Sequence, residues 1–168
     1  KQMELAMSEQ EKLYRSLIEK SLDGIVISQD GKVILVNKAF ANMIGYSIEE
    51  CISTFGPDSI APEDRERVLN IHYRRMKGEL GDMRYNAGLI CKNGNVIVAE
   101  FNTTTIEING KSASLVSVRD ITERIRMQEA INQSEKKYRE LSEMLPQTIY
   151  ELDKNGNIKY FNQTGFKQ

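Results

Sequence analysis

Apolar residues recur along the chain at two different spacings, and the change of spacing separates helices from strands. Residues 3–22 carry leucines and isoleucines at roughly helical intervals among Glu and Lys, so we expect a helix that ends before Asp23. Two β-branched runs follow, residues 25–28 and 33–36. Asp30-Gly31 lies between them and can supply the positive φ angles of a tight turn, so these runs predict a β-hairpin.

Capping signals predict three helices after this hairpin. Asn37 stands where an N-cap oxygen accepts a free backbone N–H, and Gly45 stops the helix that follows. Ser47 and Glu50 have the spacing of a capping box and begin a very short helix. A longer third helix opens at Pro62, because proline fits the first helical position and two acidic residues follow it at the positive end of the helix dipole.

Three more strands are expected, over residues 83–91, 96–107 and 112–119. Asn93-Gly94 and Asn109-Gly110 join them, and because Asn-Gly pairs favour tight hairpins, the strands should be consecutive and antiparallel. Alternate residues share one face of a strand, and the more apolar face should pack under the middle helices, which predicts an α+β fold. The residues of that face are Met83, Tyr85, Ala87, Leu89, Ile97, Ala99, Phe101 and Thr103.

Residues 122–145 form a long charged segment with helical periodicity, and Thr122 is its expected N-cap. Basic and acidic residues interleave along it, as they do on a solvated helix or the flank of a coiled coil. We expect a coiled coil of two chains, because a helix this polar gains little from its own domain, and a single exposed helix is the alternative. Its apolar stripe consists of Ile125, Ile131, Tyr138, Leu141 and Leu145.

The sequence also contains an internal repeat with a period near 124 residues. Tyr14-Arg15-Ser16-Leu17 recurs as Tyr138-Arg139-Glu140-Leu141, and the Gly and Asn of the first hairpin recur in residues 155–162. This period suits tandem domains, of which the chain holds one whole copy and the opening of another. A lone hairpin over residues 149–162 would be marginally stable in water, so we expect it to dock on a neighbouring surface, with a dimer mate as one candidate.

Composition narrows the function classes. The chain has 168 residues, with 23 Lys+Arg against 24 Asp+Glu and a formal net charge of −1, so nothing attracts nucleic acid to the surface as a whole. No apolar run is long enough to cross a membrane, and we expect no direct membrane contact within this stretch. Two cysteines cannot form a disulfide framework, which fits a reducing cytoplasm. A membrane anchor elsewhere in a parent protein is left open.

Several segments, taken in order, resemble a PAS sensory domain over about residues 22–124. The resemblance implies a five-stranded antiparallel sheet that cups a small-molecule pocket, upstream of an output module such as a histidine kinase or a diguanylate cyclase. It divides the chain into an N-terminal helix (1–21), a PAS domain (22–121), a helical signalling linker (122–145) and the truncated start of a second PAS domain (146–168). The matching segments are Asp23-Gly24-Ile25-Val26, Asp30-Gly31, Asn37-Lys38-Ala39-Phe40, Gly45-Tyr46-Ser47, Pro62-Glu63-Asp64-Arg65, Lys92-Asn93-Gly94 and the ending Val118-Arg119-Asp120-Ile121-Thr122-Glu123-Arg124.

Catalysis within this chain is not expected. The sequence has no phosphate-cradling glycine loop, no paired-cysteine zinc spacing and one histidine, so a His-based triad or a metal cluster lacks its residues. Haem-binding relatives carry an iron-ligating histidine on the long helix, where this chain has Val68, one turn before His72. Flavin photoreceptor relatives carry a reactive cysteine in an Asn-Cys-Arg-Phe-Leu-Gln segment that is absent here, so Cys51 is expected to be a small buried hydrophobe. Haem and flavin are therefore not expected.

The remaining functional feature is the pocket. A small organic ligand needs a few convergent polar groups in an apolar cleft, and the predicted face offers both. The alternative is that these side chains fill the space and leave a packed core. The pocket candidates are Phe40, Met43, Val68, Tyr85, Phe101, Thr103, Val116 and Val118.

Arg119, Asp120 and Thr122 lie where the last strand meets the linker helix. Hydrogen bonds there could fix the direction of the helix and pass a change in the pocket outward. Local stabilisation of the first helical turn is the alternative.

The sequence thus predicts a non-catalytic regulatory module that binds a small molecule, forms a homodimer through its flanking helices, or both. A ligand-free dimerisation and spacer module is the rival, and a haem or flavin binder is the third reading. The sequence alone does not identify the ligand or the output domain.

Overall fold

The computed structural model describes residues 12–162. The chain divides into two compact units, residues 1–122 and 123–168, and each is described by itself. The predicted start of the first helix, at residue 3, lies outside the described residues. Within them this helix covers residues 12–19 and so ends earlier than the predicted residue 22.

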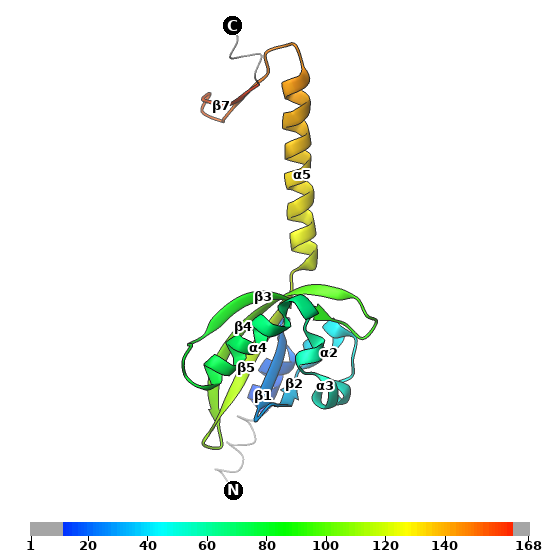
Figure 1. Ribbon diagram of the computed structural model, residues 1–168, viewed down its shortest axis with the longest axis vertical. Helices are drawn as coiled ribbons and strands as arrows, with labels where there is room; N and C mark the ends of the chain where they lie inside the picture. Colours follow the sequence, from blue (N-terminus) through cyan, green and yellow to red (C-terminus); the bar gives the residue numbers. More distant parts are fainter. Residues whose placement is uncertain (1–11, 163–168) are drawn as a thin grey trace. The chain divides into compact units, whose positions relative to one another are not determined.

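The first unit contains a five-stranded antiparallel sheet with the strand order β2-β1-β5-β4-β3 (Figure 1). Its hairpin turns lie where the sequence predicts them. Asp30 and Gly31 have φ angles of 50° and 75°, and Asn109 and Gly110 have 53° and 75°, as a tight hairpin requires. The strands are β1 (Gly24–Gln29), β2 (Lys32–Val36), β3 (Met83–Ile90), β4 (Val96–Ile108) and β5 (Lys111–Asp120).

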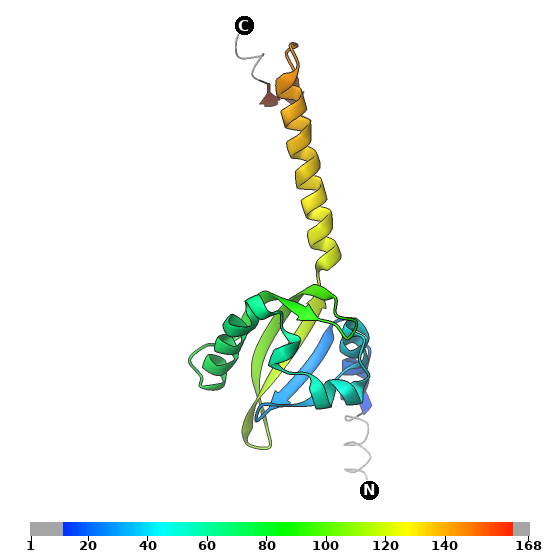
Figure 2. The same cartoon turned by 45° about the vertical axis from the view of Figure 1, so that its right-hand side comes forward.

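The helices between β2 and β3 lie against one face of this sheet (Figures 1 and 2). Asn37 caps the first of them, and the Ser47 hydroxyl and Glu50 carboxylate form the predicted capping box of the second. Pro62 is the first residue of the longest. These elements are α2 (Lys38–Ile44), α3 (Ile48–Thr54), the 3₁₀ turn η1 (Pro57–Ser59) and α4 (Pro62–Met76).

The core forms between this sheet face and the helices. Phe40 of α2 is fully buried, and its ring meets that of Phe55 edge to face with the centroids 4.9 Å apart. Gly24 leaves room for Phe40 beside β1, because a Cβ there would come within 2.9 Å of the Phe40 ring. The predicted apolar face of β3 and β4 contributes Ala87, Leu89, Ala99 and Phe101 to the same cluster.

A second close approach seats the start of α4 on β3. The Ala61 N–H donates to the Gly88 carbonyl at 2.8 Å, and the Gly88 N–H donates to Asp64 Oδ2 at 2.8 Å. A Cβ at Gly88 would lie 2.6 Å from the Ala61 side chain, so the two backbones meet only because this residue is glycine. The hydrogen bond from Gly88 also lowers the pKa of Asp64.

The side chain of Asn37 joins three segments of the first unit. It is fully buried, and its Oδ1 accepts hydrogen bonds from the N–H groups of Ile25 (2.8 Å) and Phe40 (3.0 Å). Its Nδ2 donates to the carbonyls of Ile18 and Asp23, both at 3.0 Å. The end of the first helix, the start of β1 and the start of α2 therefore share one amide, and the hydrogen-bonding capacity of that amide is fully used.

The helix α5 (Thr122–Met144) belongs to the second unit from residue 123 onward. This unit also contains a hairpin formed by β6 (Tyr150–Leu152) and β7 (Ile158–Phe161). The hairpin packs on the end of α5 in its own chain. The Tyr160 hydroxyl lies 2.6 Å from the Ser142 hydroxyl and donates to Glu143 Oε1 at 2.6 Å. Docking of the hairpin on protein is confirmed, and the docking surface is the preceding helix.

Asn162 repeats the arrangement of Asn37. It is fully buried, its Oδ1 accepts from the Ile149 N–H at 2.9 Å, and its Nδ2 donates to the carbonyls of Ser142 and Gln147, both at 2.8 Å. Each of these three partners lies 124 residues after the corresponding partner of Asn37. The internal repeat is therefore a repeat of one hydrogen-bond arrangement, in which the end of α5 takes the place of the first helix.

We predict that Asn37→Ala destabilises the first unit by about 3 kcal/mol, because it removes an N-cap and leaves buried backbone groups unpaired. Urea unfolding monitored by far-ultraviolet circular dichroism measures this loss, since the chain has no tryptophan to serve as a fluorescent probe. Asn102→Ala, at an exposed position on β4, is the matched control and should change stability by less than about 0.5 kcal/mol. Asn162→Ala should release the hairpin and leave the unfolding of the first unit unchanged. Equal stability of Asn37→Ala and Asn102→Ala would contradict this role.

Candidate functional site

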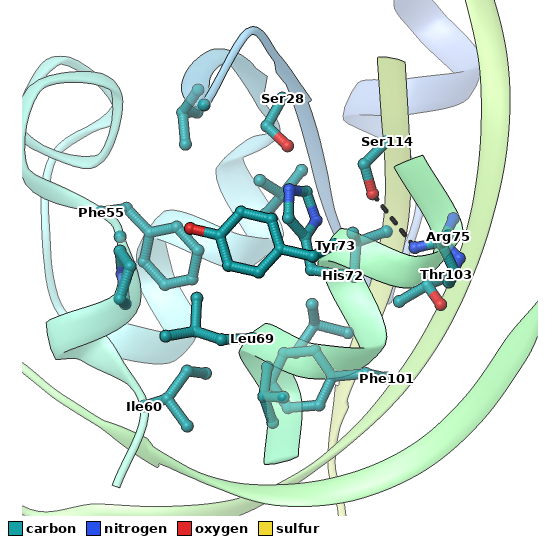
Figure 3. A pocket seen from close by; sticks show the side chains of 18 of the residues that line it. Ser28, Phe55, Ile60, Leu69, His72, Tyr73, Arg75, Phe101, Thr103 and Ser114 are labelled. Carbon is teal, nitrogen blue, oxygen red and sulfur yellow. Dashed lines mark hydrogen bonds between the residues drawn. The ribbon is translucent and has the colours of Figure 1, made fainter. Parts of the chain in front are cut away.

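A cavity of about 240 Å³ lies between the sheet and α4 in the first unit (Figure 3). Its floor is the concave face of the sheet, where alternate residues of β1 and β5 point inward. Its wall consists of α4 and the segment from Phe55 to Ile60. The sheet residues that line it are Val26, Ser28, Val33, Tyr85, Phe101, Thr103, Ser114, Val116 and Val118.

Six of the eight predicted pocket residues lie at this cavity, and two do not. Val68, Tyr85, Phe101, Thr103, Val116 and Val118 line it. Phe40 is instead packed between Gly24 and Phe55 in the core, and Met43 packs at the edge of the same core. The reason is that α2 lies against β1, whereas the cavity lies beneath α4. Whether the six residues bind a ligand stays a prediction.

One face of α4 adds His72 and Arg75, which the sequence analysis did not assign to the pocket, to the predicted Val68. Val68, His72 and Arg75 are spaced i, i+4 and i+7, so they follow one stripe of the helix, and all three line the cavity. The same spacing, continued past His72, would have pointed to Arg75. From sequence alone, an arginine on an otherwise apolar stripe is expected to face the solvent. Only the tertiary structure shows that Arg75 is buried.

Arg75 is the most buried charged residue described in the chain, with 2% of its surface exposed. Its Nη1 donates to the Ser114 hydroxyl and its Nη2 to the Thr105 hydroxyl, both at 3.3 Å. Ser114 and Thr105 are directly opposite each other on β5 and β4, so the guanidinium spans a cross-strand pair. Burial lowers the pKa of Arg75, because removal from water disfavours the charged form.

Burial also shifts the pKa values of two other titratable side chains at the cavity. Burial, and then the neighbouring charge of Arg75, lower the pKa of His72, so its imidazole is neutral near pH 7. Burial raises the pKa of Tyr85, whose ring stacks on Phe101 with the centroids 5.4 Å apart. The cavity therefore presents one cation, neutral hydrogen-bonding groups and aromatic walls.

The two cysteines lie away from this cavity. Cys51 and Cys91 are both buried free thiols, and burial raises the pKa of each, which makes them poor nucleophiles. Cys51 is the small buried residue that the sequence predicts. In the described part of the chain, no group of three or more His, Cys, Asp or Glu side chains is placed to hold a metal ion. No helix within residues 12–162 combines the length and hydropathy needed to cross a bilayer.

The end of β5 is tied to both β4 and the first turn of α5. Asp120 Oδ1 accepts a hydrogen bond from the Thr122 N–H at 2.8 Å, so Asp120 caps the helix. The predicted cap, Thr122, is itself the first helical residue, and its hydroxyl accepts from the Val98 N–H on β4 at 2.9 Å. The Ile121 N–H donates to the Val98 carbonyl at 2.9 Å. Ile121 and Thr122, the last two residues of the first unit, are thereby bonded to β4.

Arg119 forms a bidentate ion pair with Asp23. Its Nε donates to Asp23 Oδ1 and its Nη2 donates to Asp23 Oδ2, both at 2.8 Å. This hydrogen bond from Arg119 lowers the pKa of Asp23. The Asp23 carbonyl also accepts from Asn37, so Asp23 links the end of β5 to the start of α2. The three predicted relay residues thus lie together at the point where the chain enters and leaves the sheet.

Comparisons with known proteins agree with this geometry. Residues 22–123 match the sequence profile of the PAS domain family. The chain is 31% identical over 121 residues to the methyl sulfide methyltransferase-associated sensor of Methanosarcina acetivorans, and 22% identical over 162 residues to sporulation kinase E of Bacillus subtilis. These matches cover 71% and 96% of the chain but only 12% and 20% of the two relatives.

Solved structures share the fold. A domain of the sensory box sensor histidine kinase/response regulator from Geobacter sulfurreducens superposes with a TM-score of 0.57 and 23% identity, covering 68% of this chain and 96% of that one. The match over residues 22–123, together with the five-stranded sheet and the helices on one of its faces, shows that this chain belongs to the PAS domain family.

Proposed function

We propose that this PAS domain is a sensory module that binds a small organic molecule in the cavity beneath α4 and relays its presence through α5 to an output domain outside this chain. The observation that carries the proposal is the cavity itself, in which apolar walls surround a few inward-facing polar groups. A core used only for folding would close over such a space, because protein interiors pack densely. The parent protein is proposed to be a histidine kinase or a diguanylate cyclase in the cytoplasm.

The relay is proposed to run from β5 to α5. Ser114, Val116 and Val118 line the cavity, and the same strand ends at Arg119 and Asp120. A ligand that shifts β5 therefore acts on the strand whose last residue caps α5. The Thr122 hydroxyl on Val98 makes the position of the first helical turn depend on β4 as well.

A ligand-free dimerisation and spacer role is the second candidate, and one observation favours it. Ile131, Tyr138 and Leu141 are spaced by seven and three residues on α5, and each is more than half exposed in the single chain. This is the spacing of a coiled-coil seam, and covering it with a second α5 would remove an apolar stripe from water. Dimerisation through α5 is compatible with ligand binding, so we propose a homodimer for both functions.

Ligand binding is tested by a thermal-shift screen of small organic compounds. A ligand present at 100 times its Kd stabilises the folded state by about 2.7 kcal/mol, which raises Tm by roughly 10 °C for a domain of this size. Val116→Phe fills the cavity floor and should abolish the shift. Val96→Phe, at a half-exposed position on β4, is the control that should keep it. A shift that survives Val116→Phe, or no shift with any compound, would favour the spacer role.

The relay predicts that Asp120→Ala separates binding from signalling. Loss of the cap should speed amide hydrogen exchange in the first turn of α5 by about tenfold, the equivalent of roughly 1.4 kcal/mol. Ligand should slow exchange in this turn in the wild-type protein and leave it unchanged in Asp120→Ala, while the thermal shift persists. Asp58→Ala, at a solvent-facing acid, is the control. An identical response of wild type and Asp120→Ala would remove Asp120 from the relay.

The homodimer predicts that Ile131→Asp moves the protein from dimer to monomer, because it places a charge in the apolar seam. Multi-angle light scattering measures the mass directly. Gln133→Asp adds the same charge two residues away, outside the seam. The measured mass of this variant should remain that of a dimer. A wild-type protein that stays monomeric at high micromolar concentration would contradict the proposal.

A further inference from the structure

The cavity contains a buried cation that lacks an anionic partner. Arg75 bonds only to two neutral hydroxyls, and its Nε has no hydrogen-bond partner at all. It takes part in none of the ion pairs found within residues 12–162. Asp82 acts on it electrostatically, but this carboxylate is exposed and hydrogen-bonded by the Thr104 hydroxyl. The charge of Arg75 is therefore desolvated without close compensation.

Such an arrangement is costly in a folded protein. An arginine keeps its proton in proteins, so it cannot escape the cost of burial by becoming neutral. Buried charges are normally paired, because removing an ion from water costs far more than two neutral hydrogen bonds return. By contrast, the other arginines of α4 that lie near the solvent do have acidic partners, Asp58 for Arg65, Asp64 for Arg67 and Glu79 for Arg74.

The unpaired guanidinium borders the cavity. Figure 3 shows Arg75 on the α4 wall beside Ser114 and Thr103, and the ring of His72 lies toward the middle of the view, next to the ring of Tyr73. Phe55, Ile60 and Leu69 lie at the other side of the cavity. The space is thus amphipathic, with a cation and hydrogen-bonding groups at one end and aromatic and aliphatic side chains at the other.

We infer that the ligand of this cavity is a small carboxylic acid with an apolar or aromatic body, whose carboxylate pairs with Arg75. This inference rests on the proposed function and specifies its ligand class. The fork of a guanidinium matches a carboxylate, and the free Nε is one of its donors. A phosphate would bring a charge of about −1.5 to −2 to a cavity that offers one cation, so a carboxylate fits better.

The size of the cavity restricts the acid further. Its volume of about 240 Å³ is below the range of roughly 300–1,000 Å³ that is typical for drug-sized ligands. The acid is therefore a compact one, with a single ring or a short aliphatic chain. His72 is neutral before binding, so its imidazole adds a hydrogen-bonding group without adding a second positive charge.

The test uses acid and amide pairs of equal shape, benzoate with benzamide and hexanoate with hexanamide, on the 168-residue protein at pH 7. Thermal shift and titration calorimetry measure binding. We expect at least one acid to bind at least tenfold more tightly than its amide. Arg75→Met should bring the two affinities of that pair to within about twofold, and Arg75→Lys should keep part of the preference. Arg74→Met, one residue away and paired with Glu79, should retain the wild-type preference.

The stability of the ligand-free variant provides a second readout. Because Arg75→Met removes an uncompensated buried charge and keeps a long apolar side chain, its Tm without ligand should equal or exceed that of the wild type. A large loss of stability would show that Arg75 is a structural residue and would overturn the inference. If the protein bound an amide as tightly as the matched acid, the inference would also be overturned. The proposed sensing function would then remain intact. Failure of all four compounds, together with no hit in the wider screen, would overturn both.

Discussion

The buried amide of Asn37 is the interaction on which the arrangement of the first unit depends. Its two acceptor sites and two donors are used by four backbone groups, and these groups belong to the end of the first helix, the segment before β1, β1 itself and α2. Each of those groups would otherwise be a buried donor or acceptor without a partner, which costs about 1–3 kcal/mol. No other residue of this size offers two donors and two acceptors in that geometry, which explains why the same residue recurs as Asn162.

This constraint has a functional consequence, because the residues around Asn37 also receive the end of the sheet. Asp23 gives its carbonyl to Asn37 and its carboxylate to Arg119. Asp23, which directly precedes β1, therefore connects Arg119 at the end of β5 with Asn37 at the start of α2. For the relay that we propose, this connection would let the segments before β1 and after β5 respond to the same sheet.

The cavity shows a different balance between stability and function. Ala87, Leu89, Ala99 and Phe101 pack closely beneath the helices, whereas the floor beneath the end of α4 remains open. A buried charge without an anionic partner at that opening costs stability, and under our proposal a ligand carboxylate that pairs with Arg75 would offset that cost. On that proposal, ligand binding would raise the stability of the domain through its contact with Arg75.

Local sequence signals determined much of this structure. The Asp-Gly and Asn-Gly turns, the Asn37 cap, the Ser47–Glu50 capping box and the alternation on β3 and β4 each encode a conformation within a few residues, and the structure contains all of them. The internal repeat aligned Asn162 with Asn37, and the structure shows that the two make equivalent hydrogen bonds. Such signals are legible because turns, caps and strand faces depend on neighbouring residues.

Only the tertiary structure decided which of these residues meet. It moved Phe40 and Met43 away from the cavity because α2 covers β1, and it brought in His72 and Arg75 because α4 crosses the other end of the sheet floor. The sequence predicted Thr122 as the N-cap of α5, but in the structure Asp120 accepts the hydrogen bond from the first helical N–H. The Thr122 hydroxyl instead accepts from Val98 on β4. Each outcome depends on how far one element lies from another distant in the chain, and the burial of an arginine or the use of a hydroxyl follows from that packing rather than from local sequence.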